Sequence, residues 1–322
     1  MPYNSVISRT DAAALIPESV SAEIMAAVPQ VSAVMQLARR LPNLSRAQQR
    51  IPVMSALATA YFVTGDNSAK QTTEVNWSNK YIDAEEIAAI VPIPEAVLDD
   101  AGYDIWSEVR PSLQEAFGRA IDAAVLYGTN IPATWSTNLG AAGLIAGVSA
   151  ASQQLSLAAY TDMYEAILGE TGAGVAGLFG AVEADGFMVT GSIAPVGTKA
   201  KLRNVRSQEG VPLFSVSMKA ANTYELDGAP ILFPMNGAIS GTYYLISGQW
   251  NQLVYAIRQD ITYKILTEAV IQDGSGNIIY NLAQQDMVAL RAVMRVGFAL
   301  PNPINRMQET EASRYPFATL TA

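Results

Sequence analysis

The sequence predicts an α+β protein of elongated shape, and three patterns support this class. Apolar residues recur at helical spacing over 95–128, alternate as in a long strand over 288–300, and alternate again in a shorter stretch that ends at residue 82. A chain of 322 residues, half of them hydrophobic, is long enough for two lobes. We therefore expect one long helix, long strands and a second region with its own core.

The composition excludes several kinds of site. The chain has no Cys and no His, which removes disulfides, thiolate and imidazole metal sites, and Cys or Ser-His nucleophiles. Its net charge of −9 disfavours tight binding to phosphates, so contact with DNA should be weak and nonspecific. The uncharged stretch between Asp122 and Asp162 is interrupted by Gly, Pro and polar residues, so it predicts no membrane span, and no signal peptide is visible.

Residues 1–45 are predicted to form an arm. Pro17, Pro29 and Pro42 each end or bend a helix. This apolar segment cannot form a compact core alone, so we expect it to lie on another surface.

Residues 59–82 predict a β-hairpin with a turn at 65–70. In its second strand one face carries Thr73, Val75, Trp77, Asn79 and Tyr81. A two-stranded ribbon is marginal in water, so an apolar stripe on it needs a docking surface, in its own chain or the next. Val75, Trp77 and Tyr81 are therefore candidate subunit contacts.

The helical pattern over 95–128 predicts a helix that ends at Gly128. Its apolar face carries Ile105, Val109, Leu113, Phe117, Ala120, Ile121 and Ala124. Pro111 interrupts the pattern, and an interior proline costs about 3 kcal/mol. We expect a kink or a restart there.

Residues 131–257 form a second region, richer in Gly and Pro. A short helix is predicted over 161–168, capped by Thr161 or Asp162. Short strands are predicted at 187–190, 231–233, 243–246 and 253–257.

Residues 261–300 return to long strands around a turn at 273–277. Every even-numbered position from Val288 to Leu300 is apolar, while Arg291 and Arg295 fall on the other face. We expect the even face to pack under the long helix, and the two arginines to meet acids of a neighbouring subunit or, as an alternative, DNA.

Three motifs have a chemical and a structural interpretation. Gly172–Gly177 matches the G-x-G-x-x-G of dinucleotide sites, but it follows a predicted helix rather than a strand, which favours a plain glycine-rich loop. The acid pairs at 85–86 and 99–100 have the chemistry of metal ligands or acid–base groups, yet adjacent acids are usually solvated or ion-paired. The turn at 273–277 lacks the twelfth-position Glu of a calcium loop. We predict no catalytic residue, metal or cofactor.

Basic residues form two clusters in the sequence. The first consists of Arg39, Arg40, Arg46 and Arg50, and the second of Lys199, Lys201, Arg203 and Arg206. Nucleic-acid contact is one interpretation. The acidic total favours the other, a solvated face or salt bridges, including pairs with an acidic patch on another subunit.

The order of these parts resembles the tailed-bacteriophage major capsid protein family with the Hong Kong 97-like fold. The likeness covers about residues 12 to 305 and is carried by degenerate segments in a fixed order. They are VPIPEAVLDD (91–100), IDAAVLYG (121–128), LDGAPI (226–231), ISGQW (246–250) followed by Arg258, and RVGFALPNP (295–303).

The resemblance implies an arm (1–45), an extended hairpin loop (46–90), a peripheral domain with a spine helix (91–130 and 258–322) and an axial domain with a central sheet (131–257). It further implies self-assembly, as hexamers and pentamers, into an icosahedral virion capsid that encloses double-stranded DNA and forms in the host cytoplasm. The implied partners are other copies of the chain, a portal, and possible scaffolding or decoration proteins, with no membrane.

The chain departs from the family pattern in two ways. Only about 45 residues precede the hairpin, so scaffolding should come from a separate protein or from none. Some members cross-link a hairpin Lys to a later Asn; Lys70 and Lys80 fit the first part, but the later region reads Gln284-Gln285-Asp286 and the nearest Asn is Asn281. We therefore expect a noncovalent shell.

Two other functions remain open from the sequence. An encapsulin-like nanocompartment has the same fold. A nucleotide-binding enzyme using Gly172–Gly177 belongs to another class, and it lacks both the preceding strand and a catalytic partner. Particle size separates a shell from an enzyme, and the particle contents separate a phage head from a nanocompartment.

Overall fold

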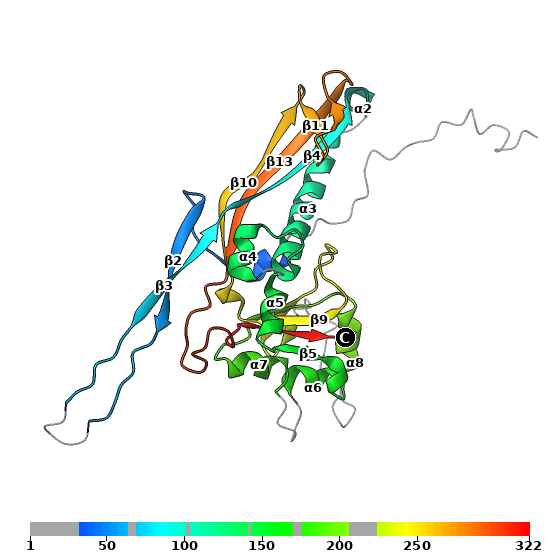
Figure 1. Cartoon of the computed structure of the whole chain (residues 1–322). Coiled ribbons are helices and arrows are strands. Elements are labelled where there is room, and N and C mark those ends of the chain that lie inside the picture. Colours follow the sequence, from blue (N-terminus) through cyan, green and yellow to red (C-terminus); the bar gives the residue numbers. More distant parts are fainter. Residues whose placement is uncertain (1–31, 64–68, 101–103, 141–142, 170–175, 206–223) are drawn as a thin grey trace, which may run out of the picture.

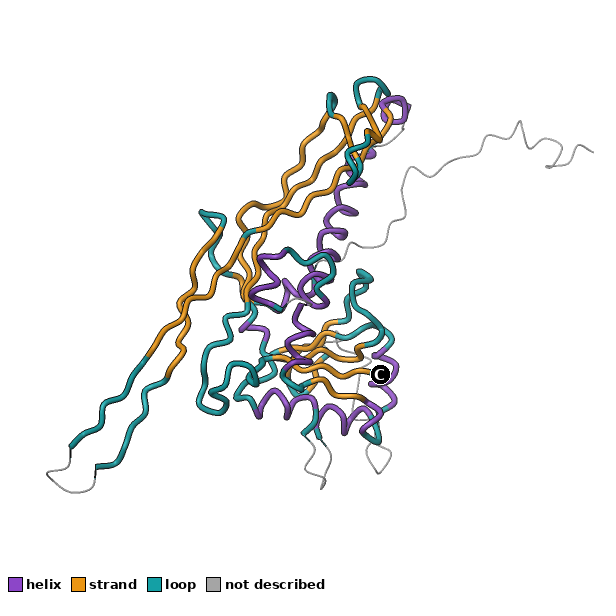
Figure 2. Tube along the Cα trace, viewed as in Figure 1, coloured by secondary structure: helices purple, strands orange, loops and turns teal. Residues whose placement is uncertain are grey.

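The computed structural model describes residues 32–63, 69–100, 104–140, 143–169, 176–205 and 224–322. Figure 1 shows three parts: a long sheet with a helix along it, a compact lobe below, and a hairpin that projects away from both. Figure 2 shows that long strands dominate the first part and mixed helices and strands the lobe. The elongated α+β architecture predicted from the sequence is confirmed.

The long sheet has four strands in the order β1-β10-β13-β4. Their bounds are Arg39–Arg40 (β1), Val254–Leu266 (β10), Met287–Ala299 (β13) and Glu85–Pro94 (β4). β13 runs antiparallel to both β10 and β4, and β1 is parallel to β10. The alternation predicted for 288–300 is confirmed, because Leu290, Val296 and Phe298 are buried while Arg291 is exposed.

The helix along this sheet is α3 (Ile105–Tyr127), capped by Asp104 and ended by Gly128 in the left-handed conformation. Its buried residues Leu113, Phe117, Ile121 and Ala124 share one core with the even positions of β13, as predicted. The expected restart at Pro111 is wrong, because the helix runs through it; a kink, the other expected outcome, stays a prediction. Ser107, whose carbonyl loses its usual N–H donor there, is exposed to water. The preceding helix α2 (Glu95–Asp100) is separate.

The lobe contains a six-stranded sheet in the order β5-β14-β9-β6-β8-β7. The bounds are Gln154–Ser156 (β5), Phe317–Thr321 (β14), Tyr243–Gly248 (β9), Gly191–Ile193 (β6), Ala229–Leu232 (β8) and Glu225–Leu226 (β7). The predicted strands at 231–233 and 243–246 are confirmed within a few residues, whereas 187–190 is not a strand and β6 follows it.

The C-terminal strand β14 corrects the predicted division of the chain. We expected all of 258–322 to return to the part that holds the long helix, but β14 lies between β5 and β9. Phe317 and Leu320 are fully buried there. A five-residue strand buried on both faces has no alternation, so its sequence gave no sign of its place.

Short helices surround the lobe sheet and join it to the upper part. They are α4 (Ala133–Leu139), α5 (Gly143–Ala150), η2 (Leu157–Ala159), α6 (Met163–Leu168), α7 (Leu178–Ala184), α8 (Thr198–Asn204) and η3 (Trp250–Gln252). Asp162 caps α6 by accepting from the Glu165 N–H, which confirms one of its two predicted caps.

The projecting hairpin pairs β2 (Gln48–Ala56) with β3 (Asn76–Asp83). The predicted alternation of the second strand is confirmed, but the first strand lies before 59–82 rather than within it. The ladder runs from the Gln48–Asp83 pair to the Ala56–Asn76 pair, and its inner side chains Val53 and Ile82 are buried. Since β4 begins at Glu85 and joins the long sheet, the hairpin ends earlier than residue 90.

A smaller ribbon joins β11 (Val270–Gln272) to β12 (Ile278–Asn281). The Asp273 carboxylate accepts the backbone N–H groups of Ser275 and Asn277 and the side-chain amide of Asn277. These hydrogen bonds, chiefly that from the Asn277 side chain, lower the pKa of Asp273. The segment is therefore a hydrogen-bonded turn, as predicted.

Candidate subunit-contact surface

The hairpin has two unequal faces. Directly opposite residues of an antiparallel pair lie on the same face, so Trp77 sits beside Met54 and Tyr81 beside Arg50. We call this side of β2 and β3 the outer hairpin face. The other side, with Val53 and Ile82, packs against its own chain.

The outer hairpin face is not covered by the described residues of its own chain. Trp77 is 66% exposed, Tyr81 40% and Met54 38%. Further along, Phe62 is fully exposed and Tyr61 is 57% exposed. Large apolar side chains grouped on a thin projection are typical of a protein–protein contact. Val75 lies just before β3 begins and is half-buried.

The base of the hairpin is held firmly to the body. Ile82 and Leu44 share a small core with Val254 and Ala299. The Trp135 indole N–H donates to the Asp83 carbonyl at 2.9 Å. Gly297 lies against the same carbonyl, where an added Cβ would come within 2.6 Å, so only glycine fits. The hairpin therefore leaves the body in a defined direction.

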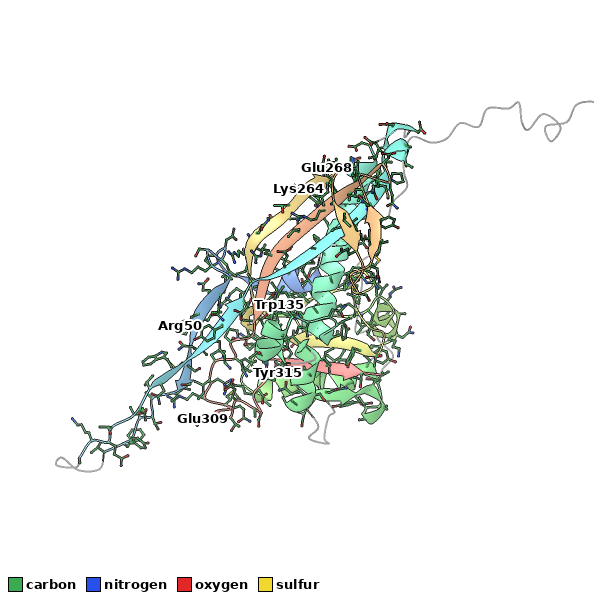
Figure 3. All side chains as sticks on the ribbon, turned by 45° about the horizontal axis from the view of Figure 1, so that its top comes forward. Arg50, Trp135, Lys264, Glu268, Glu309 and Tyr315 are labelled. Carbon is green, nitrogen blue, oxygen red and sulfur yellow. The ribbon has the colours of Figure 1, made fainter. Side chains whose placement is uncertain are left out.

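The loop after β13 braces the hairpin from the side. Lys80 forms a 2.7 Å ion pair with Glu311, the Ile304 N–H donates to the Met54 carbonyl at 3.4 Å, and the Arg306 guanidinium donates to the Ala58 carbonyl. Figure 3 places Glu309, from the same loop, next to the hairpin. We call residues 302–314 the brace loop.

A buried arginine folds the brace loop onto itself. Arg314 is 3% exposed, and its guanidinium donates to the carbonyls of Asn302, Gln308 and Glu309 and to the Asn302 side chain. Burial is the main cause that lowers its pKa. Sequence reasoning missed this residue, because a lone Arg between loop residues gives no periodic signal.

The predicted arginines occupy different places. Arg50 lies on the outer hairpin face, as Figure 3 shows, and Arg39 and Arg40 form β1. These three and Arg46, in the loop before β2, are all exposed.

Arg291 and Arg295 lie on the face of the long sheet away from α3. Arg291 is exposed, but Arg295 is half-buried and faces Glu86 of its own chain across 3.8 Å. The acid expected from a neighbour is thus supplied, at least for Arg295, within the same subunit.

The end of the arm is tied to α3 through a buried carboxylate. Asp122 accepts from the Ser32 hydroxyl at 2.5 Å, from the backbone N–H groups of Ala33 and Val34, and from the Asn236 amide at 2.7 Å. Burial raises the pKa of Asp122, and the four hydrogen bonds oppose that rise. The short helix α1 (Ala33–Leu37) therefore lies on its own chain.

The structure shows where the acid pair, the glycine-rich segment and the second basic cluster lie. Glu85 accepts from the Thr134 hydroxyl, and within the described ranges no three acids gather as a metal site would require. Most of Gly172–Gly177 lies outside the described residues; Gly177 is the N-cap of α7, and the helix that precedes it in the chain is α6. Lys199 and Lys201 lie over the rings of Tyr224 and Tyr244. Arg206 lies outside the described residues.

No helix in the described part of the chain is long and apolar enough to cross a membrane. The projecting hairpin presents an apolar face that the described residues of its own chain leave uncovered. Such a face is typical of a protein that contacts other chains.

Comparison with known proteins agrees with this class. The family model for the phage capsid family matches residues 12–305. The major capsid protein of Staphylococcus phage 80alpha is 26% identical over 278 residues, which cover 85% of this chain and 78% of that protein. A structure from Microbacterium phage Oxtober96 has a TM-score of 0.81 and 33% identity over 98% of this chain and 99% of its own.

More distant structures share the same fold. One from Mycobacterium phage Bobi has a TM-score of 0.78 at 27% identity over 98% of this chain and 99% of its own. The capsid of a native GTA particle has a TM-score of 0.63 at 16% identity over 99% of each chain. The chain belongs to the phage capsid family, and its fold is the Hong Kong 97-like fold.

Proposed function

We propose that the chain is the major capsid protein of a tailed bacteriophage, which assembles with copies of itself, as hexamers and pentamers, into an icosahedral head around double-stranded DNA. The observation that carries the proposal is the outer hairpin face. Trp77, Tyr81 and Met54 are exposed on a ribbon whose base is rigidly held, so each subunit presents apolar surface to the next.

The geometry supports a closed assembly of many copies. The outer hairpin face and the body it leaves are different surfaces, so a contact between one copy's hairpin and another copy's body is heterologous. Heterologous contacts generate rings when the rotation closes. The family match and the phage capsid structures that resemble the whole chain support the same arrangement.

The remaining parts of the proposal follow from a shell that encloses a genome. The partners are a portal and, where used, separate scaffolding or decoration proteins, and assembly takes place in the host cytoplasm. With a net charge of −9, the chain contacts DNA weakly and without sequence preference. A structural role needs no catalytic residue.

Light scattering of the purified protein tests the proposal. Particles of megadalton mass are the expected result, and a protein that stays monomeric or dimeric under all assembly conditions contradicts it. Extraction of nucleic acid from native particles then distinguishes the contents. Double-stranded DNA supports the phage head, whereas packaged enzymes without DNA would indicate an encapsulin-like compartment.

A further inference from the structure

The charges of this chain are segregated at two places that one subunit cannot bring together. Four arginines and no acid occur in residues 39–50, which we call the basic segment: Arg39, Arg40, Arg46 and Arg50. Five acids and no base occur in residues 95–108, which we call the acidic end: Glu95, Asp99, Asp100, Asp104 and Glu108.

The basic segment runs along one edge of the body at the base of the hairpin. Arg39 pairs with Val254 in β1, the Leu41 N–H donates to Tyr255, and the Leu44 N–H donates to Ile257, so the backbone follows β10 before it enters β2. All four arginines are exposed, and none forms an ion pair with any residue that the structure describes. Arg40 donates to the side-chain oxygen of Asn43 at 3.2 Å.

The acidic end lies at the opposite extremity of the long sheet. Figure 1 shows α2 where β4 ends, and Figure 3 shows Glu268, near that end, far from Arg50 on the hairpin. The five acids are exposed, and among the described residues none of them has an ion-pair partner. Asp104 caps α3, but Asp99 and Asp100 occupy the last turn of α2.

Asp99 and Asp100 occupy an electrostatically unfavourable position in their own helix. The carboxyl end of a helix carries partial negative charge, which favours cations there and disfavours carboxylates. The helix α2 also buries none of its residues, and its Val97 is 49% exposed. The short helix α2 has no buried residue and carries unfavourable charges at its end. Both features make sense if another chain packs on the helix and places cations beside its carboxylates.

We propose that the acidic end of one subunit docks on the basic segment of a second copy of this chain. The two surfaces are complementary in charge, each copy carries both, and their separation within one subunit makes the contact intermolecular. The overall charge of −9 favours this partner over packaged DNA for the same arginines. The proposal rests on the shell function, since it joins subunits of that shell.

Charge swapping tests the contact. Reversing three arginines of the segment (R39E, R40E and R46E) should slow assembly at low salt by roughly tenfold or more, because complementary charges raise association rates by that order. Reversing three acids of the end (E95K, D99K and D100K) should do the same. A chain with all six changes should recover, since both partners are then inverted. Arg50 is left unchanged because it also lies on the outer hairpin face.

Controls separate this contact from folding and from other functions. Each variant should keep the parent's thermal unfolding temperature as an unassembled protein. The single variant R46E has R119E as its matched control. R119E reverses an exposed arginine on α3 and should leave assembly unchanged. An equimolar mixture of the two triple variants should assemble faster than either alone, since each then meets its complement.

Several results would overturn the proposal. The contact is excluded if both triple variants assemble like the parent at low salt. It is also excluded if the variant with all six changes assembles as slowly as the triple variants. If R39E/R40E/R46E assembles normally but its particles hold less DNA, the arginines serve the genome instead. A parent protein that forms no particle at all contradicts the shell function itself, which is a different failure.

Discussion

The body of this protein and its hairpin differ in how far their large apolar side chains are buried. In the body, Phe298 is fully buried, with the Trp135 ring centroid at 5.2 Å and the Tyr255 ring at 5.7 Å. In the hairpin, Trp77 is 66% exposed, and no described residue covers Phe62. Aromatic residues therefore pack within the chain in one region, and in the other they are available to contact another chain.

This contrast predicts that mutations in the two regions have different effects. A buried side chain contributes to the stability of the subunit, whereas an uncovered one contributes only when another chain covers it. Stability and assembly should therefore be separable, with core substitutions affecting the first and hairpin substitutions the second.

The largest expected effect on stability is at Phe298. F298A leaves a cavity beside Trp135 of α4 and Tyr255 of β10, and should lower the free energy of unfolding by about 3–5 kcal/mol. Urea unfolding of the unassembled protein measures this, together with a fall in soluble yield. The matched control is F62A, which should leave stability unchanged; a loss below about 1 kcal/mol for F298A would mean that this core is not packed as described.

A smaller effect is expected at Asp122. D122N replaces one acceptor oxygen with an amide that faces other donors, and an unsatisfied buried donor costs about 1–3 kcal/mol. Urea unfolding at neutral pH measures the loss, and increased proteolysis of the segment before Ser32 would report release of α1. If D122N has the stability and the proteolysis pattern of the parent, the hydrogen bonds of Asp122 do not hold the arm in place.

The same residue predicts a pH dependence. Because burial raises the pKa of Asp122 above its ordinary value, the folded state binds the proton more readily than the unfolded state. Its contribution therefore makes the free energy of unfolding rise as the pH falls through the raised pKa. The D122N variant should lack this component in a comparison of unfolding curves across that range, and an identical pH profile would contradict it.

The ion pair between Lys80 and Glu311 should have the smallest effect. Its two side chains are 32% and 63% exposed, and exposed pairs contribute about 0–1 kcal/mol. K80E should therefore barely change the unfolding curve, but it places two like charges where the brace loop meets the hairpin. The double variant K80E/E311K should restore parent behaviour in assembly; if K80E alone assembles normally, the brace loop does not set the hairpin direction through this pair.

The shell should need no covalent cross-links. The region that would carry the acceptor reads Gln284-Gln285-Asp286, and Lys80 is already paired with Glu311. Denaturing electrophoresis of mature particles should give one band near 34.3 kDa. A ladder of multimers would show that another Lys and Asn react.

Sequence patterns predicted the elements that have a period. The even positions from Leu290 to Leu300 and the helix residues Leu113, Phe117, Ile121 and Ala124 lie in the core of the body, as predicted. Val288 is only half-buried, and Ala120, which was predicted on the same helix face, is exposed. Pro111 does not interrupt the helix, and the residue whose carbonyl loses its N–H donor, Ser107, is exposed to water. The strand β14 could not be placed, since its register is set by β5 and β9 rather than by its own five residues.

The candidate contact surface was predicted only in part. Alternation placed Trp77 and Tyr81 on one face, as in the structure, but the first strand of the hairpin was expected within 59–82 and lies at Gln48–Ala56. Arg295 meets Glu86 of a strand that pairs with its own, a proximity that depends on sheet register. The brace loop and Arg314 have no local pattern and become visible only in three dimensions.

The central claim is that the outer hairpin face is open in the free subunit and covered by another copy in the assembled particle. Hydroxyl-radical footprinting with mass spectrometry tests it most directly, by comparing the oxidation of Trp77 in unassembled protein and in purified particles. Trp135, which is 1% exposed, is the internal control and should be protected in both. Strong oxidation of Trp77 in the free subunit and its protection in the particle is the predicted result; equal oxidation of Trp77 in both would contradict the account.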